Sequence, residues 1–220
     1  IVVAGGFGKR FGAPKPKLLT ELAGKPIIYH SLRNVAISQV HRIVLVVPQD
    51  YVEEYVEIAK DSAGEKLYSI EIGGRERTDS VRNGLNALAG ICGDDDIVLI
   101  HDGARPFATP ELFNRCAEEC MKSGAVIPAI QSVDTVKVVK DRKIVNTPTR
   151  ENYWFAQTPQ AFHYKIIKSA INSGGNFTDD ASAVESIGIK VSVIQGERTN
   201  MKITTAEDMK IATALIKIMQ

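Results

Sequence analysis

A glycine-rich segment followed by cations stands near the start of the chain, and its residue types suit the binding of a phosphate chain. Three glycines occur within four positions, at Gly5, Gly6 and Gly8. Glycine lets the backbone turn tightly and point several N–H groups at one anion. Arg10 and Lys17 then supply the full positive charges that a triphosphate needs and a simple turn does not. The segment therefore predicts a site for a nucleotide triphosphate.

The spacing of these glycines argues against two familiar nucleotide-binding loops. A dinucleotide fingerprint needs G-x-G-x-x-G, but here Gly12 comes one position late, and the second strand ends in Pro48 without an acidic residue for a ribose. A P-loop needs Gly-Lys-Ser/Thr after the glycines, which is missing. A purely structural turn is the remaining alternative, and the flanking cations favour the phosphate site.

A second cluster, His101-Asp102-Gly103-Ala104-Arg105-Pro106, follows directly after an apolar run typical of a buried strand. Open α/β sheets bind ligands just beyond the carboxyl ends of their strands. Asp102 is therefore a candidate to hold Mg²⁺ against phosphate oxygens, since this ion takes few carboxylates plus substrate oxygens. The alternative is an aspartate that caps a turn or pairs with Arg105. We interpret His101 as a packed imidazole rather than a general base.

A third loop runs from Gly73 and Gly74 through Arg75 to Asp79 and Ser80. Paired glycines allow a close backbone approach, so main-chain groups here could read the edge of a base, although a capped helix start is an equal alternative. Several later residues, each by itself typical of a solvated charge, a cap or a turn, complete the set of candidates: Thr135, Arg150, Thr158, the run Thr178-Asp179-Asp180, and Lys202.

Short β-branched runs alternate with longer helical patterns along the chain, which predicts an α/β fold with a mostly parallel twisted sheet flanked by helices. Alternating apolar residues around a turn at 141–142 predict a β-hairpin arm within 133–152, and one domain spans residues 1–220. The predicted strands are residues 1–3, 42–47, 67–72, 97–100, 125–129 and 190–194. The predicted helices are residues 27–36, 52–60, 80–89, 110–123, 159–173 (mostly helical), 179–187 and 205–219.

The composition is that of an ordinary soluble globular protein, with 44% hydrophobic and 24% charged residues. A formal net charge of +1 gives no basic field for nucleic acid, so none is expected as a partner. The three cysteines lack paired spacing, and the apolar runs are too short to cross a bilayer. We therefore expect a cytoplasmic protein without a membrane partner.

Taken together, these segments resemble the 2-C-methyl-D-erythritol 4-phosphate cytidylyltransferase family of isoprenoid-precursor enzymes. The resemblance runs through essentially the whole chain. It rests on Ala4-Gly5-Gly6-Phe7-Gly8-Lys9-Arg10, Pro16-Lys17, Gly73-Gly74 through Asp79-Ser80-Val81, His101-Asp102-Gly103-Ala104-Arg105-Pro106, Asp134-Thr135, Thr158-Pro159-Gln160-Ala161-Phe162, Thr178-Asp179-Asp180-Ala181-Ser182-Ala183 and Lys202-Ile203-Thr204.

The resemblance implies a Rossmann-like nucleotidyltransferase fold, a homodimer formed through the arm, and Mg²⁺-dependent transfer of CMP from CTP to a sugar-alcohol phosphate. It implies that Arg10, Lys17 and Lys202 are the catalytic cations and that Asp102 serves the metal. Thr135 and Arg150 on the neighbouring subunit's arm, together with Thr158, would bind the substrate phosphate. The nucleotide-binding residues would be Ala4, Gly5, Gly6, Gly8, Gly74, Arg75, Ser80, Gly103 and Arg105.

Two other functions share features with this sequence. Ribitol-5-phosphate cytidylyltransferases carry most of the same motifs and are the alternative, but two segments favour 2-C-methyl-D-erythritol 4-phosphate as the predicted acceptor: Asp102-Gly103-Ala104-Arg105 and Thr178-Asp179-Asp180-Ala181. A catalytically silent nucleotide-binding dimer is the more distant alternative. The joint presence of Lys17, Asp102 and Lys202 argues against it, because binding alone does not require all three.

Overall fold

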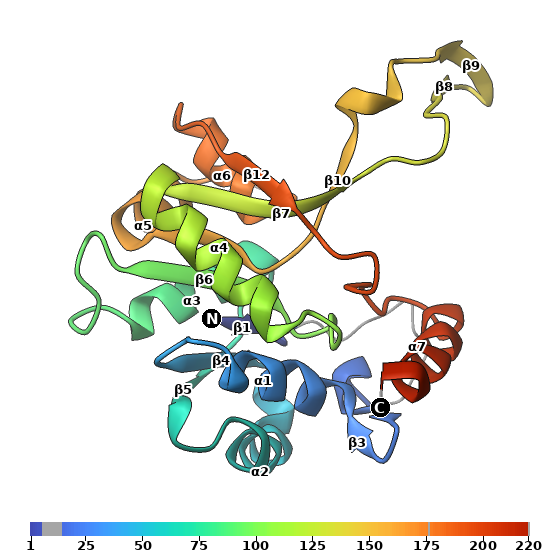
Figure 1. The fold of residues 1–220 in the computed structure, drawn as a ribbon. Coiled ribbons are helices and arrows are strands. Elements are labelled where there is room, and N and C mark those ends of the chain that lie inside the picture. Colours follow the sequence, from blue (N-terminus) through green and yellow to red (C-terminus); the bar gives the residue numbers. More distant parts are fainter. Residues whose placement is uncertain (6–14, 176, 220) are drawn as a thin grey trace.

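The computed structural model describes residues 1–5, 15–175 and 177–219, and a mixed eight-stranded sheet forms its centre (Figure 1). The strands of this sheet are β1 (Val2–Val3), β4 (Ile43–Val47), β5 (Leu67–Ile72), β6 (Ile97–Asp102), β7 (Ala125–Gln131), β10 (Trp154–Ala156), β11 (Gln160–His163) and β12 (Ser192–Gln195). Their order is β10-β7-β11-β6-β1-β4-β5, with β12 paired to β7.

Helices cover both faces of the sheet, as the alternation of strand and helix patterns predicts. One apolar layer packs α1 (Ile27–Ile37), α2 (Val52–Ala63) and α4 (Pro110–Ser123) against the sheet, and α7 (Ala206–Met219) joins this layer beside residues 21–22. The other layer packs α3 (Arg77–Ala87), α5 (Tyr164–Asn172) and α6 (Asp180–Ser186) against the opposite face. None of the helices in the described part of the chain is long and apolar enough to span a bilayer.

The strand order places a crevice at the carboxyl ends of β1 and β6. β1 pairs in parallel with β4 on one side and with β6 on the other. The chain therefore adds β4 and β5 on one side of β1 and then crosses over to add β6 on the other side. Such a switch in strand order is where doubly wound sheets bind ligands. The register pairs Val3 with Asp102, which brings the start of the glycine-rich segment beside the carboxylate.

A hairpin arm extends from the sheet beyond β7 (Figure 1). It contains β8 (Val138–Lys140) and β9 (Lys143–Asn146), joined by Asp141 and Arg142 at φ values of 50° and 62°. Positive φ at both central residues is typical of tight hairpin turns. The predicted hairpin is therefore confirmed, with its turn at the expected position.

The predicted element order agrees with the structure except in three places. Residues 160–163, predicted as helix, form β11, which pairs antiparallel with both β6 and β7, so cross-strand pairing overrides the local pattern. Helix α3 begins at Arg77 instead of residue 80, because Glu76 donates its N–H to the Asp79 carboxylate at 3.2 Å in a capping box. Strand β10 and a short ladder of β2 (Glu21–Leu22) with β3 (Lys25–Pro26) were not predicted.

Candidate active site

The glycine-rich segment enters the site directly from β1. The Ala4 N–H donates to the Val46 carbonyl at 2.7 Å, which fixes the end of this strand against β4. Ala4 is buried, and Gly5 lines a pocket at the sheet edge. Gly6, Gly8 and Arg10 lie outside the described residues, so their predicted contacts with phosphate stay predictions.

Gly5 and the Gly73–Gly74 loop approach each other closely around Ser80. The Gly74 N–H donates to Ser80 Oγ at 3.1 Å, and a Cβ added to Gly5 would lie 3.1 Å from the same oxygen. A Cβ at Gly74 would lie 2.1 Å from the Asp79 Cβ, so no side chain fits there. These glycines bring two backbone segments together at one wall of the pocket, as the sequence pattern predicts.

The pocket has a volume of about 240 Å³ and collects residues from distant parts of the chain. Its lining residues are Val3, Ala4, Gly5, Lys17, Leu18, Gly74, Arg75, Glu76, Arg77, Ser80, Asp102, Ala104 and Lys202. The structure therefore brings together the predicted cations Lys17 and Lys202, the predicted metal ligand Asp102 and most of the described residues predicted around the nucleotide.

Asp102 is the electrostatic centre of this pocket. Its Oδ2 lies 2.7 Å from Lys202 Nζ and 3.8 Å from Arg105 Nε, while Oδ1 lies 3.4 Å from Arg77 Nε. Burial alone would raise the pKa of Asp102, but the charges of Lys202 and Arg77 outweigh it and hold the pKa below its usual value. The carboxylate is therefore ionised at neutral pH and shared among three cations.

Lys17 is held beside this carboxylate by the segment that carries Lys202. Its ammonium group donates to the Ile203 carbonyl, and the Ile203 N–H donates to the Ala104 carbonyl at 2.9 Å. Arg105 donates through Nη1 to the Asn200 carbonyl at 2.8 Å. One short segment thus fixes both predicted catalytic lysines relative to Asp102.

Thr158 and His101 lie buried behind the carboxylate. Thr158 Oγ1 accepts the Asp102 N–H at 3.0 Å and lies 3.0 Å from His101 Nδ1. Burial lowers the pKa of His101 to about 3, so the imidazole is neutral at physiological pH. This confirms the interpretation of His101 as a packed imidazole. Thr158 positions the Asp102 backbone here, and its contact with a substrate phosphate stays a prediction.

Four other predicted site residues lie away from the pocket lining. Gly103 lies behind it, where an added Cβ would come within 2.7 Å of Ile28 Cδ1, and Arg105 supports the 200–203 segment. Thr135 and Arg150 are exposed on the arm, where Arg150 donates to the Val133 carbonyl at 3.0 Å. Neither Thr135 nor Arg150 lines this pocket, so their contact with a substrate phosphate stays a prediction.

Sequence reasoning missed the pocket residue Arg77, and it gave its partner Asp180 no more than a place in the candidate run Thr178-Asp179-Asp180. Arg77 lines the pocket, and its two terminal nitrogens bind the buried Asp180 carboxylate at 2.8 and 2.7 Å. Both residues stand inside the motifs that carry the family resemblance, but nothing local pairs them. Only the fold brings the starts of α3 and α6 together.

The carboxylate at the pocket fits a divalent cation that a triphosphate helps to hold. Among the described residues no group of three or more histidine, cysteine, aspartate or glutamate side chains could bind a metal by itself. Mg²⁺ commonly takes one or two carboxylates together with substrate phosphate oxygens and water. Asp102, ionised and lining the pocket, matches that pattern.

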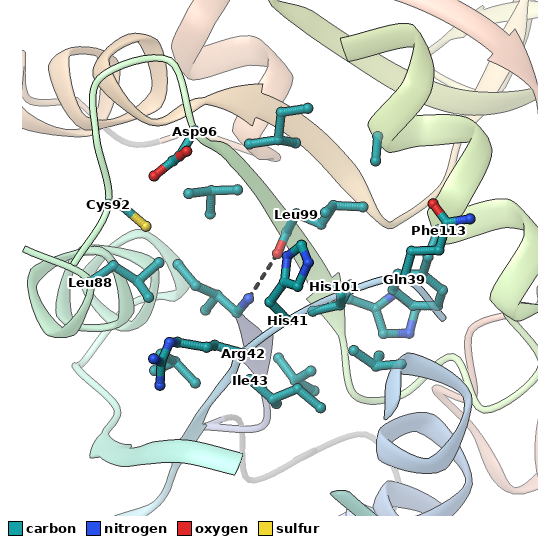
Figure 2. Close-up of a pocket in the computed structure, with 18 of the residues that line it drawn as sticks. Gln39, His41, Arg42, Ile43, Leu88, Cys92, Asp96, Leu99, His101 and Phe113 are labelled. Carbon is teal, nitrogen blue, oxygen red and sulfur yellow. Dashed lines mark hydrogen bonds between the residues drawn. The ribbon is translucent and has the colours of Figure 1, made fainter. Parts of the chain in front are cut away.

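A second and larger pocket, of about 600 Å³, lies at the opposite edge of the sheet, where the parallel strands begin (Figure 2). Its wall includes Ile43, Leu99 and Phe113, and the Ile1 amino group donates to the Leu99 carbonyl at 2.8 Å. None of the described residues predicted to bind the nucleotide, the acceptor or the metal lines it, although the packed His101 does. The chemistry predicted from the sequence therefore belongs to the smaller pocket.

An open α/β sheet with a glycine-lined pocket at its switch point, two lysines and one ionised carboxylate defines the nucleotidyltransferase class. Such a site neutralises a triphosphate and aligns an acceptor with it, which is most of what phosphoryl or nucleotidyl transfer requires. The comparisons with known proteins agree with this class and narrow it.

The sequence model of the 2-C-methyl-D-erythritol 4-phosphate cytidylyltransferase family matches residues 1–218. The enzyme of that name from Geobacter metallireducens is 42% identical over 99% of this chain and 96% of its own length. The one from Syntrophus aciditrophicus is 44% identical over 99% and 94%. The crystal structure of 4-diphosphocytidyl-2C-methyl-D-erythritol synthase from Anaerococcus prevotii superposes with a TM-score of 0.85 at 33% identity, covering 98% of this chain and 94% of that one.

The chain belongs to the 2-C-methyl-D-erythritol 4-phosphate cytidylyltransferase family. It is a cytidylyltransferase that uses CTP to cytidylylate 2-C-methyl-D-erythritol 4-phosphate in isoprenoid precursor synthesis. This confirms the predicted reaction and decides against the ribitol phosphate enzyme and the silent binding protein. The Rossmann-like fold implied by the resemblance is likewise confirmed.

Proposed function

We propose that the 240 Å³ pocket holds CTP and that CMP transfer takes place at its floor. The observation that carries this proposal is the meeting of Lys17, Asp102 and Lys202 in one pocket, although three distant segments supply them. Ala4, Gly5, Gly74, Arg75 and Ser80 bind the cytosine and its surroundings. Gly103 and Arg105 support the ribose side from behind the lining, and Gly6 and Gly8 stay predicted nucleotide-binding residues.

The chemical step requires positioning and charge neutralisation more than proton transfer. A phosphate oxygen of the acceptor attacks the α-phosphorus of CTP, a new P–O bond forms, and the bond to the leaving pyrophosphate breaks. The attacking oxygen is already anionic, so no general base is needed, in keeping with a neutral, buried His101. Lys17, Lys202 and Arg10 stabilise the charge that develops on the phosphate oxygens.

We further propose that Asp102 holds Mg²⁺ together with the triphosphate, and that the metal supplies charge neutralisation there. The three cations around Asp102 support binding of the metal with CTP rather than alone, since they already balance the carboxylate. When the triphosphate enters, Lys202 exchanges its contact with Asp102 for a phosphate oxygen. We place the reaction in the cytoplasm, which suits three free cysteines.

A product assay tests the reaction and its metal requirement together. With CTP, Mg²⁺ and 2-C-methyl-D-erythritol 4-phosphate, we expect CDP-methylerythritol and pyrophosphate in equal amounts. Chelation of Mg²⁺ by EDTA is expected to abolish both products, and added Mg²⁺ to restore them. Ribitol 5-phosphate serves as the control acceptor, and a preference for it would contradict the proposed substrate.

We also propose that the arm, residues 133–152, joins two copies into a homodimer and brings Thr135 and Arg150 to the partner's pocket. The support is an unusual concentration of exposed apolar side chains on and beside the arm, which a monomer would leave in water. They are Val133, Val138, Val139, Ile144, Val145, Tyr153, Trp154 and Phe155. Together with Thr158, the two arm residues would bind the phosphate of the acceptor.

Placing charges on the arm is expected to separate the dimer. In the double variant Val139→Asp/Ile144→Asp, light scattering should give the mass of a monomer, because both side chains are more than half exposed and would lie in the interface. The specificity constant kcat/KM for the acceptor should fall about 10- to 100-fold, the value of one or two hydrogen bonds to a charged group.

The matched control is Ile37→Asp, an equally exposed isoleucine at the end of α1. This control should remain dimeric and fully active. A dimeric Val139→Asp/Ile144→Asp variant with unchanged kinetics would contradict the role of the arm.

A further inference from the structure

A buried ion pair lies immediately beneath the carboxylate of the pocket. Arg77, the first residue of α3, binds both oxygens of Asp180, the first residue of α6, at 2.8 and 2.7 Å. The Asp180 side chain is 1% exposed and that of Arg77 is 27% exposed. Planar two-point pairing of this kind fixes the orientation of the guanidinium as well as its position.

The Nε–H of Arg77 faces the proposed metal ligand. Arg77 Nε lies 3.4 Å from Asp102 Oδ1, while Lys202 Nζ lies 2.7 Å from the other oxygen, Oδ2. The carboxylate is thus held at both oxygens by two different cations. If Lys202 turns to the triphosphate, Arg105 stays 3.8 Å from Oδ2 and Arg77 still holds Oδ1, which keeps Asp102 in orientation.

Asp180 is itself fixed by its neighbours. The Gln160 side chain accepts the Ala181 N–H at 2.9 Å and donates to the Asp179 carboxylate at 2.9 Å. Asp179 Oδ1 in turn accepts the Ser182 N–H at 3.0 Å. Hydrogen bonds from Gln160 therefore hold the start of α6 against β11. Arg77 links this fixed helix start to Asp102, because it binds both Asp180 and Asp102.

We propose that Arg77 is a positioning residue for Asp102, with Asp180 as its buried anchor. The inference rests on the proposed role of Asp102 as the metal ligand. Asp180 holds both terminal nitrogens of Arg77 while Nε faces Asp102, so these ion pairs fix the guanidinium relative to the Asp102 carboxylate. Partners that orient a metal-binding carboxylate commonly contribute about 10- to 100-fold to metal affinity or activity.

The test measures metal binding directly, with Mn²⁺ as the probe and the unreactive analogue α,β-methylene CTP in place of CTP. Free Mn²⁺ is followed by its paramagnetic resonance signal in the wild type and in Arg77→Met, Asp180→Asn, the double variant and Asp102→Asn. Arg82→Met is the matched control, since Arg82 stands on the same helix and pairs with Asp79 at 2.7 Å away from Asp102. Steady-state kinetics on the same proteins give kcat and the KM for CTP.

In Arg77→Met we expect Mn²⁺ affinity and kcat to fall about 10- to 100-fold, with KM for CTP changed much less. Asp180→Asn should also lower Mn²⁺ affinity and kcat. The double variant should lose no more of either than Arg77→Met does, because Asp180 acts on Asp102 only through Arg77. Arg77→Lys should not rescue, since an ammonium cannot make the two-point contact with Asp180 and reach Asp102 as well. Arg82→Met should match the wild type.

Arg77→Met leaves Asp180 buried without a partner and can fail to fold, so the double variant, which leaves no uncompensated charge, is the safeguard. Normal Mn²⁺ affinity in the folded double variant would overturn the proposal. The proposal would also be overturned if the loss of Mn²⁺ affinity in the double variant equalled the product of the losses in the two single variants, since the residues would then act independently. Unchanged Mn²⁺ affinity in Asp102→Asn would instead remove the metal assignment itself, and this inference with it.

Discussion

Replacing Lys202 with alanine is expected to lower kcat by about 10²- to 10³-fold, with a much smaller rise in the KM for CTP. The ammonium group lies 2.7 Å from Asp102 in the pocket, where the proposed reaction develops charge as pyrophosphate leaves. A cation that acts mainly in the transition state affects kcat more than ground-state binding. Pyrophosphate release at varied CTP and saturating acceptor measures both constants.

Lys17→Ala should behave in the same way, although its loss also removes the contact with the Ile203 carbonyl. Thermal unfolding of each variant separates the two effects, since a change in kcat at an unchanged midpoint reports on catalysis alone. Lys25→Ala is the control, because the Lys25 ammonium pairs with exposed Asp61 at 2.8 Å and does not line the pocket. A near-normal kcat in both Lys17→Ala and Lys202→Ala would refute the proposed role.

The order of helices and strands could be predicted from the sequence because it depends on local patterns. Helix α4 and strand β5 have the predicted bounds, since Thr109 caps one and turn residues limit the other. Strand β11 could not be predicted in this way. Its buried residues at 160–162 carry no alternation, and only their pairing with β6 and β7 makes them a strand.

Single residues of the candidate site could be predicted from the sequence, but the ion pair that joins two of its segments could not. Asp102 was identifiable because it directly follows an apolar strand pattern, and Lys17 because it follows the glycine-rich segment. The ion pair between Arg77 and Asp180 leaves no local signal, since a charged residue near a helix start is usually a cap or a solvated group. The two side chains meet only because α3 and α6 pack on the same face of the sheet.

Asp102→Asn is expected to lower kcat by about 10³-fold or more, because the proposed metal would lose its protein ligand and with it several kcal/mol of charge stabilisation. Asparagine keeps the shape of the side chain, and the backbone bond from Asp102 to Thr158 is unaffected by the exchange. Added Mg²⁺ should not restore the rate. The control is Asp95→Asn, which removes an exposed carboxylate paired with Lys165 at 2.7 Å and should leave kcat unchanged.

A second measurement distinguishes a metal ligand from a purely structural ion-pair centre. The exchange leaves Lys202, Arg77 and Arg105 without their shared anion, so the variant should unfold at a lower temperature. Because the site then carries one negative charge fewer, metal-free CTP should bind at least as tightly as it does to the wild type, while affinity for the metal in the CTP complex falls. If Asp102 only balanced these cations, the Mg²⁺ concentration needed for half-maximal activity would stay the same in the variant. An unchanged Mg²⁺ requirement together with a modest loss of kcat would therefore make Asp102 a structural anion, and the metal would have to be held by the triphosphate alone.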